Sequence, residues 1–255
     1  MPEHPGGHAV MLDDMQVLHD AVRDYRTAAT SLGLPWPEPD DGPGGPVPPP
    51  APDVVHRIFD VDHVAEQLSW LHARGWEERA PLPEAGWLFP WPTEANVDEM
   101  FGYLSLSAGA PFPWRHQLPL IWFNKLVYTF VLAGDHEGEI WRYEIEPDTN
   151  GPVRAATSLA ALFTQWTRAI RAGLMRFDDP FIWVGEDSWS DDALVQALQE
   201  ARLDPVAFPL HLFGTPVERA RQIESGVDMA TIDRGFGAWE ELDDEIDRVR
   251  ATLRW

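Results

Sequence analysis

The sequence predicts an α+β fold, in which a largely antiparallel sheet has its helices packed mainly on one face. Three runs rich in β-branched and aromatic residues, 120–123, 126–132 and 140–145, follow one another with polar breaks between them. This pattern is typical of consecutive antiparallel strands. The first two runs are apolar at almost every position, as in central strands that are buried on both faces. An amphipathic segment follows the strands and supplies the helix that such a sheet needs as a cover.

The third strand is expected to have one apolar face and one mixed face. Trp141 and Tyr143 alternate along it with Arg142 and Glu144, and side chains in a strand point to opposite faces in turn. We therefore expect the apolar face of this strand to join the core.

The covering helix is predicted from its start, its spacing and its end. Ser158 is a good N-cap, and Gly173 is a good stop. Between them, five apolar residues recur at helical spacing and form one stripe: Leu159, Leu162, Phe163, Trp166 and Ile170.

The amino-terminal part predicts two further helices with a proline-rich segment between them. Residues 1–9 are expected to be a flexible tail, and a helix with an apolar stripe then runs to about Gly33. Residues 35–53 are rich in Pro, Gly and Asp and are typical of an extended linker. Asp60 is expected to cap the second helix and Gly75 to end it, and its buried stripe would be Val61, Val64, Leu68 and Leu71.

Two more strands and several helices are expected around this centre. Residues 87–91 and 101–107 are interpreted as strands that complete the sheet, the first of them at an edge because it contains prolines. A short strand is expected at 181–184, and Ser190 and Thr215 are predicted to begin helices, the second with Glu218 as a capping box. With a last helix whose stripe is Leu242, Ile246, Val249 and Leu253, these segments form a helical carboxy-terminal extension from about residue 176.

Three segments of the middle of the chain resemble the SUKH superfamily, which includes the Smi/Knr cell-wall-assembly regulators and bacterial immunity proteins. They are the strand from Leu118 to Phe123, the segment Gly138 to Trp141, and the helix start from Ala156 to Phe163. Relatives usually have Asp-Gly after the first of these strands, where this chain has Asn124 and Lys125; Asn can adopt the positive φ that the turn needs. The resemblance implies that residues 10–255 form one SUKH-like domain, including the linker and the carboxy-terminal extension.

The same resemblance implies a binding module without catalysis, most often an immunity protein that occupies the surface of a cognate bacterial toxin. The alternative within the resemblance is a regulatory scaffold of the Smi/Knr type that binds a cellular protein. In the immunity interpretation, the acidic surface would meet a basic toxin domain, with aromatic anchors inside an acidic rim.

Charge and composition limit the possible partners. The 42 acidic residues outnumber the 19 basic ones, giving a formal net charge of −23, which opposes nucleic-acid binding through phosphate contacts. The charge either keeps the protein soluble and monomeric or steers a basic partner; we expect a monomer or a weak dimer. No leader-like amino terminus and no run of roughly 20 apolar residues is present, so we expect a cytoplasmic protein without a membrane partner.

The sequence contains none of the common catalytic or cofactor motifs. There is no cysteine, which excludes thiolate chemistry, and nucleophile elbows, phosphate-binding loops and zinc helices are absent. We therefore expect no catalytic residue, no cofactor and no metal. The remaining enzyme hypothesis is an uncharacterised hydrolase that uses a carboxylate pair; the adjacent pairs are Asp178-Asp179, Glu186-Asp187 and Asp191-Asp192.

The candidate partner-binding residues lie in and after the break between the second and third strands. A turn that contains a histidine could titrate near neutrality, although a plain polar hairpin turn explains the same residues. The tryptophans likewise either fill the core or line an exposed groove. The predicted binding residues are Asp135, His136, Glu137, Glu139 and Trp141.

Overall fold

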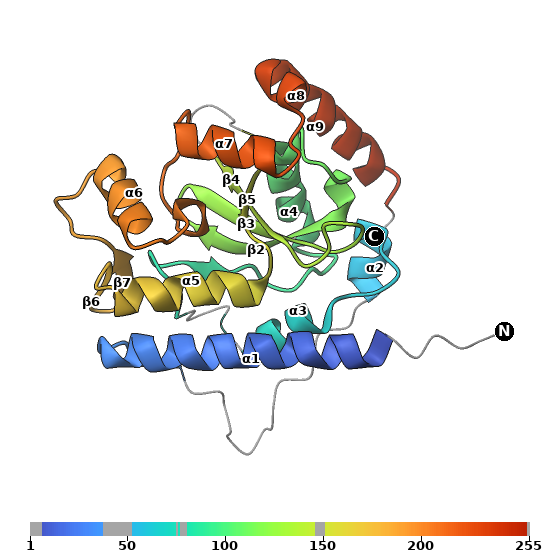
Figure 1. Cartoon of the computed structure of the whole chain (residues 1–255). Helices are drawn as coiled ribbons and strands as arrows, with labels where there is room; N and C mark the ends of the chain where they lie inside the picture. The colour runs from blue at the N-terminus through green and yellow to red at the C-terminus, as the bar shows by residue number, and fades with distance from the viewer. Residues whose placement is uncertain (1–6, 38–52, 75, 77–80, 146–150, 254–255) are drawn as a thin grey trace.

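A computed structural model describes residues 7–37, 53–74, 76, 81–145 and 151–253. It confirms the α+β prediction: a five-stranded antiparallel sheet lies at the centre, with its strands in sequence order (Figure 1). These strands are β1 (Trp87–Leu88), β2 (Gln117–Phe123), β3 (Leu126–Val131), β4 (Ile140–Glu144) and β5 (Val153–Ala156). A separate hairpin consists of β6 (Met175–Asp178) and β7 (Phe181–Val184).

The helices precede, interrupt and follow the sheet strands. Before or between the strands lie α1 (Gly7–Ser31), α2 (Asp53–Phe59), α3 (Glu66–His72), α4 (Val97–Leu104) and α5 (Leu159–Arg171). After the hairpin come α6 (Asp191–Glu200), α7 (Pro216–Glu224), α8 (Met229–Asp233) and α9 (Phe236–Arg250). The described residues also include the short 3₁₀ turns η1 (Ser105–Ser107), η2 (Trp114–His116) and η3 (Pro205–Ala207).

The predicted three-stranded meander is confirmed as β2, β3 and β4. Asn124 has the positive φ of +48° that was expected in the β2–β3 turn. Every residue of β3 and β4 is buried, including the mixed face of β4. Strand β5 was not predicted, because its four residues, Val-Arg-Ala-Ala, carry too little apolar area to be recognised as a strand.

One face of the sheet is covered by α5, as predicted. Ser158 caps this helix, since its hydroxyl accepts the N–H of Ala161 at 3.1 Å. The Trp166 ring of α5 lies 6.2 Å from that of Phe123 on β2. Helix α1 packs outside α5, with the ring of Tyr25 5.5 Å from that of Phe163.

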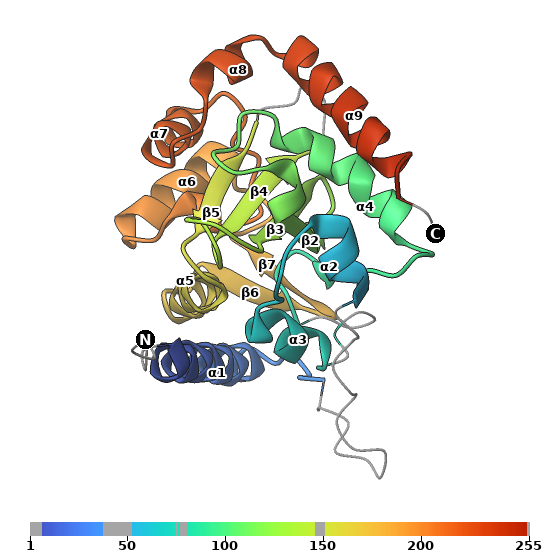
Figure 2. The same ribbon diagram turned by 90° about the vertical axis from the view of Figure 1, so that its right-hand side faces the viewer.

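The other face of the sheet is also covered. Figure 2 shows the sheet between α5 and α1 on one side and α4 and α9 on the other. A second group of buried residues fills this layer, with Phe112 5.1 Å from Trp141. Trp239 of α9 donates from Nε1 to Ser105 Oγ at 3.0 Å, which joins α9 to the turn η1.

The predicted strand at 101–107 is part of that second cover and is helical instead. Four buried residues of α4, Val97, Met100, Phe101 and Leu104, recur at spacings of three, one and three, which is the period of a helix. The apolar run that looked like a strand is therefore the end of an amphipathic helix and the turn η1.

The second predicted helix begins later than expected. Asp60 has φ +56° and follows the end of α2 instead of capping a helix, and the helix that buries Leu68 and Leu71 begins at Glu66. The predicted stop at Gly75 and most of the predicted linker, residues 38–52, lie outside the described residues. Helix α1 begins at Gly7, within the stretch expected as a tail, whose residues 1–6 are also outside the described residues.

The carboxy-terminal strand and two helix starts lie where the sequence predicted them. The predicted strand at 181–184 is β7, and Ser190 and Thr215 cap α6 and α7. The Glu218 carboxylate accepts the N–H of Gly214 at 2.8 Å, so it reaches one residue further back than a capping box requires.

In the described part of the chain, no helix combines the length and the apolarity needed to cross a membrane.

Candidate functional site

The predicted residues of the β3–β4 turn are brought together around Glu139. Its Oε2 accepts a hydrogen bond from Trp141 Nε1 and lies near His136 Nδ1, both at 2.9 Å. Its Oε1 accepts from Arg154 Nη1 of β5, also at 2.9 Å. The Glu139 side chain is only 14% exposed, and its partners hold the turn against the edge strand. The geometry therefore makes Glu139 a structural centre of the turn.

Trp141 is fully buried and offers no surface to a partner, which corrects its prediction as a binding residue. Its ring lies against Phe112 in the core beneath α9. Asp135 and Glu137 are exposed at the tip of the turn, and Glu137 pairs with His63 Nε2 at 2.8 Å. That these two carboxylates contact a partner stays a prediction.

An exposed group of aromatic rings lies elsewhere, where strands β1 and β2 meet α4. We call Trp87, Phe89, Tyr103 and Trp122 the aromatic patch. The ring of Trp122 lies 6.0 Å from that of Trp87 and 5.2 Å from that of Tyr103, and Phe89 lies 5.3 Å from Tyr103. Trp87 is 38% exposed, Tyr103 and Trp122 are partly exposed, and Phe89 forms the buried floor.

The aromatic patch has an acidic neighbour. Burial raises the pKa of the Tyr103 hydroxyl, and the negative charge of Glu99, one turn earlier on α4, raises it further. The sequence prediction missed this patch because it treated 101–107 as a strand, in which Tyr103 would not be placed over Trp122. The signal that could have found it is the helical spacing of Met100 and Leu104, which leaves Tyr103 beside the buried stripe.

The predicted carboxylate pairs only partly come together. Glu186, Asp187 and Asp191 line a cleft of about 450 Å³ with Glu84 and Lys125, whereas Asp178 and Asp179 are on the exposed hairpin. Burial raises the pKa of Glu84, whose carboxylate accepts the N–H of Val184 at 2.7 Å. Asp187 is paired with Arg176. This cleft is where the hydrolase hypothesis would have to place its chemistry.

Among the described residues, no group of three or more His, Asp and Glu side chains is arranged to hold a metal ion.

A buried charged cluster ties β4 to the carboxy-terminal region. Arg142, 1% exposed, donates to the carbonyl oxygens of Phe208 and Leu210 and to Glu144 at 2.9 Å. Glu144 in turn accepts the N–H of Leu212 at 2.8 Å. Because Arg142 and Glu144 each have several polar partners, these interactions offset the free-energy cost of removing both charges from water.

Glu218 lies beside this cluster and should give the protein a pH-dependent stability. Burial raises its pKa to about 7, and the charge of Glu144 adds to the rise. Since the ordinary value is 4.5, the folded state binds more protons than the unfolded state between these values, and its stability falls as the pH rises through about 7.

We expect the wild type to lose on the order of 2 kcal/mol more unfolding free energy than Glu218→Gln between about pH 5 and about pH 8. Glutamine keeps an acceptor for the N–H of Gly214 but cannot ionise. Urea unfolding at both pH values measures the difference. Parallel pH profiles for the two proteins would show that Glu218 ionises without a folding cost.

The fold and these sites define an α+β protein whose sheet is covered on both faces, with an exposed aromatic patch at one edge. No protein-family model, curated protein or solved structure matches the chain.

Proposed function

We propose that this protein is a non-catalytic protein-binding module, and that it acts as an immunity protein that neutralises a basic toxin domain. The observation that carries the proposal is the aromatic patch. Trp and Tyr are enriched among the residues that dominate binding energy at protein interfaces, and they act best where a partner can remove them from water. Trp87, Tyr103 and Trp122 present such rings side by side on a scaffold of two strands and a helix.

The charge of the chain complements this patch. An excess of 23 negative charges attracts a basic partner at long range and speeds encounter, and the attraction weakens as salt rises. The aromatic contacts are made only after encounter and affect mainly the dissociation rate. The proposal therefore predicts a salt-dependent association rate and a dissociation rate that depends on the tryptophans.

The test uses the product of the adjacent gene, which the proposal expects to be basic, expressed with and without this chain. We expect that protein to be toxic alone and harmless when this chain is present. The double variant Trp87→Ser, Trp122→Ser should lose protection and bind at least roughly 30-fold more weakly, because a single hot-spot residue contributes about 2 kcal/mol or more. The matched control is Trp189→Ser, since Trp189 is 37% exposed but lies outside the aromatic patch; it should protect like the wild type.

Two outcomes would contradict parts of the proposal. Equal loss of protection in the Trp189 control would mean that the patch has no special role. If the neighbouring protein is harmless alone and this chain instead co-purifies with a cellular protein through the same tryptophans, the Smi/Knr-type scaffold replaces the immunity function.

A further inference from the structure

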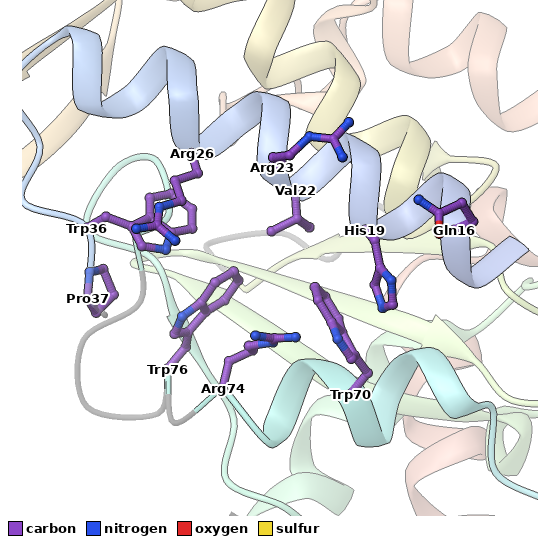
Figure 3. Close-up of a pocket in the computed structure, with 10 residues that line it drawn as sticks. All are labelled: Gln16, His19, Val22, Arg23, Arg26, Trp36, Pro37, Trp70, Arg74 and Trp76. Carbon is purple, nitrogen blue, oxygen red and sulfur yellow. The ribbon is translucent and has the colours of Figure 1, made fainter. Parts of the chain in front are cut away.

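Two concave sites of the protein differ in the charge of their walls. The pocket in Figure 3, between α1 and the end of α3, has arginines and no carboxylate among its described lining residues. The cleft of about 450 Å³ between the β6–β7 hairpin, the start of α6 and the β2–β3 turn is of the size of small-molecule sites. We call it the acidic cleft, because four carboxylates line it: those of Glu84, Glu186, Asp187 and Asp191.

The basic side chains that line the acidic cleft already have partners. Arg176 pairs with Asp187. His211 Nδ1 lies 3.6 Å from Glu144 Oε2, and Lys125 is engaged as well. The positive charges of the cleft are therefore used within the protein.

Glu186 and Asp191 differ from these bases, because among the described residues neither carboxylate has an ion-pair or hydrogen-bond partner. Burial is the main cause of the raised pKa of Glu84, and the negative charge of Asp191 raises this pKa further. The carboxylates of Glu84 and Asp191 are therefore near enough to repel each other. A cation bound in the cleft would relieve this repulsion.

Two tryptophans supply apolar walls to the acidic cleft. Trp183 of β7 is partly exposed, and Trp189 is 37% exposed. The N–H of Trp189 donates to the carbonyl oxygen of Glu186 at 2.9 Å, so this ring and this carboxylate lie on one tight turn. The turn is held against α6, since Gly185 has φ +75° and a Cβ at this position would clash with Leu194. The ring and the carboxylate are therefore presented from a fixed position.

We infer that the acidic cleft binds a linear aliphatic amine that carries at least two ammonium groups. The ammonium groups pair with the carboxylates of Glu186 and Asp191, since charge-assisted hydrogen bonds are the stronger kind. The methylene chain between them packs on the indoles of Trp183 and Trp189, whose faces also attract ammonium groups.

The walls of the cleft disfavour other ligand classes. An anion would face the carboxylates, and a neutral ligand would leave the charges of Glu186 and Asp191 without partners. A divalent metal ion is disfavoured because, within the described ranges of the chain, no three His, Asp and Glu side chains are arranged to hold one. A single ammonium group would pair with only one of the two carboxylates, so a second ammonium group should strengthen binding.

Amines of increasing charge test the inference. Butylamine, 1,4-diaminobutane and spermidine carry one, two and three amino groups on similar methylene chains, and Mg²⁺ supplies charge without an apolar chain. Calorimetry on the full chain uses about 0.15 M salt, which screens the general attraction of cations to an acidic protein. We expect 1,4-diaminobutane or spermidine to bind at a single site, at least about ten-fold tighter than butylamine, and to resist displacement by an equal concentration of Mg²⁺.

Carboxylate variants then place the site. Asp191→Asn and Glu186→Gln should each weaken the tighter amine about ten-fold or more. The matched control is Asp192→Asn, because Asp192 is exposed in the same first turn of α6 but does not line the acidic cleft. It removes the same charge and should bind like the wild type.

Three results would overturn the inference. They are no binding of either polyvalent amine, equal affinity for butylamine and the polyvalent amines, and an equal loss of affinity in Asp192→Asn. The last of these would mean that amines only gather on the acidic surface.

This inference is independent of the proposed function. The acidic cleft shares no residue with the aromatic patch, so the variant Trp87→Ser, Trp122→Ser should bind the amine with wild-type affinity whether or not it still binds a protein partner. Conversely, Trp189→Ser should weaken amine binding and still protect against the toxin.

Discussion

Replacing Arg142 by methionine is expected to lower the free energy of unfolding by about 3–5 kcal/mol, the usual cost of removing one member of a buried ion pair. The substitution leaves the Glu144 carboxylate, 5% exposed, without its charged partner. It also removes the Arg142 hydrogen bond to the Leu210 carbonyl oxygen and one of two hydrogen bonds to the Phe208 carbonyl oxygen, which still accepts the N–H of Leu210. A typical domain is stable by only about 5–15 kcal/mol, so this single change removes a large part of the total.

Urea unfolding of Arg142→Met measures this loss, and Arg248→Met is the control. Arg248 is exposed, and among the described residues it donates only to the carbonyl oxygen of Asp244 in its own helix. Its replacement should therefore change stability by no more than about 0.5 kcal/mol. The double variant Arg142→Met, Glu144→Leu should recover only part of the loss, because the N–H of Leu212 then lacks an acceptor. If Arg142→Met lowers the free energy of unfolding by less than about 1 kcal/mol, the claim that Arg142 belongs to a stabilising buried cluster is contradicted.

Replacing Trp141 by alanine is expected to lower the free energy of unfolding by about 3–5 kcal/mol, as for other fully buried aromatic residues. The substitution opens a cavity against Phe112 and leaves Glu139 with one hydrogen bond fewer. Trp141→Phe keeps most of the ring volume but removes the donor, so its cost should be about 1–2 kcal/mol. Denaturant unfolding of both variants measures whether the alanine variant loses more stability than the phenylalanine variant.

The contrast with the aromatic patch makes this prediction informative about function. Trp141→Phe should bind a protein partner with unchanged affinity, because the residue is inside the fold, whereas Trp87→Ser should retain stability and lose affinity. If the Trp141→Phe protein is fully stable but cannot bind the partner, Trp141 contacts the partner directly, which would contradict its burial.

The centre of the fold was predictable because its signals are local. The β-branched runs of β2 and β3, the N-cap at Ser158 and the caps at Ser190 and Thr215 each act within a few residues. Even the positive φ of Asn124 follows from the residue type and its place between two strands.

The elements that sequence reasoning missed depend on tertiary partners. Strand β5 is too short to be recognised alone and exists because β4 pairs with it. The run 101–107 carries both a strand composition and a helical spacing, and the buried face of α4 decides between them. Asp60 has the residue type of an N-cap, but the chain turns there with a positive φ after α2.

The candidate site shows the same limit. The charged turn at 135–139 is easily seen in the sequence. The neighbouring residues do not indicate, however, that the Glu139 carboxylate accepts a hydrogen bond from Arg154 of β5. Trp141 and Trp87 are both strand tryptophans, and only the layer formed by α9 and η1 distinguishes the buried ring from the exposed one.

Hydrogen–deuterium exchange on the wild-type protein, alone and in complex with the adjacent gene's product, tests the central proposal most directly. The aromatic patch as the docking surface predicts slower exchange of the amides at 87–89 and 101–104 in the complex, with little change at the turn 134–139. Slower exchange at the turn 134–139 alone would contradict the proposed role of the patch. So would a complex that forms without slowing exchange at either segment.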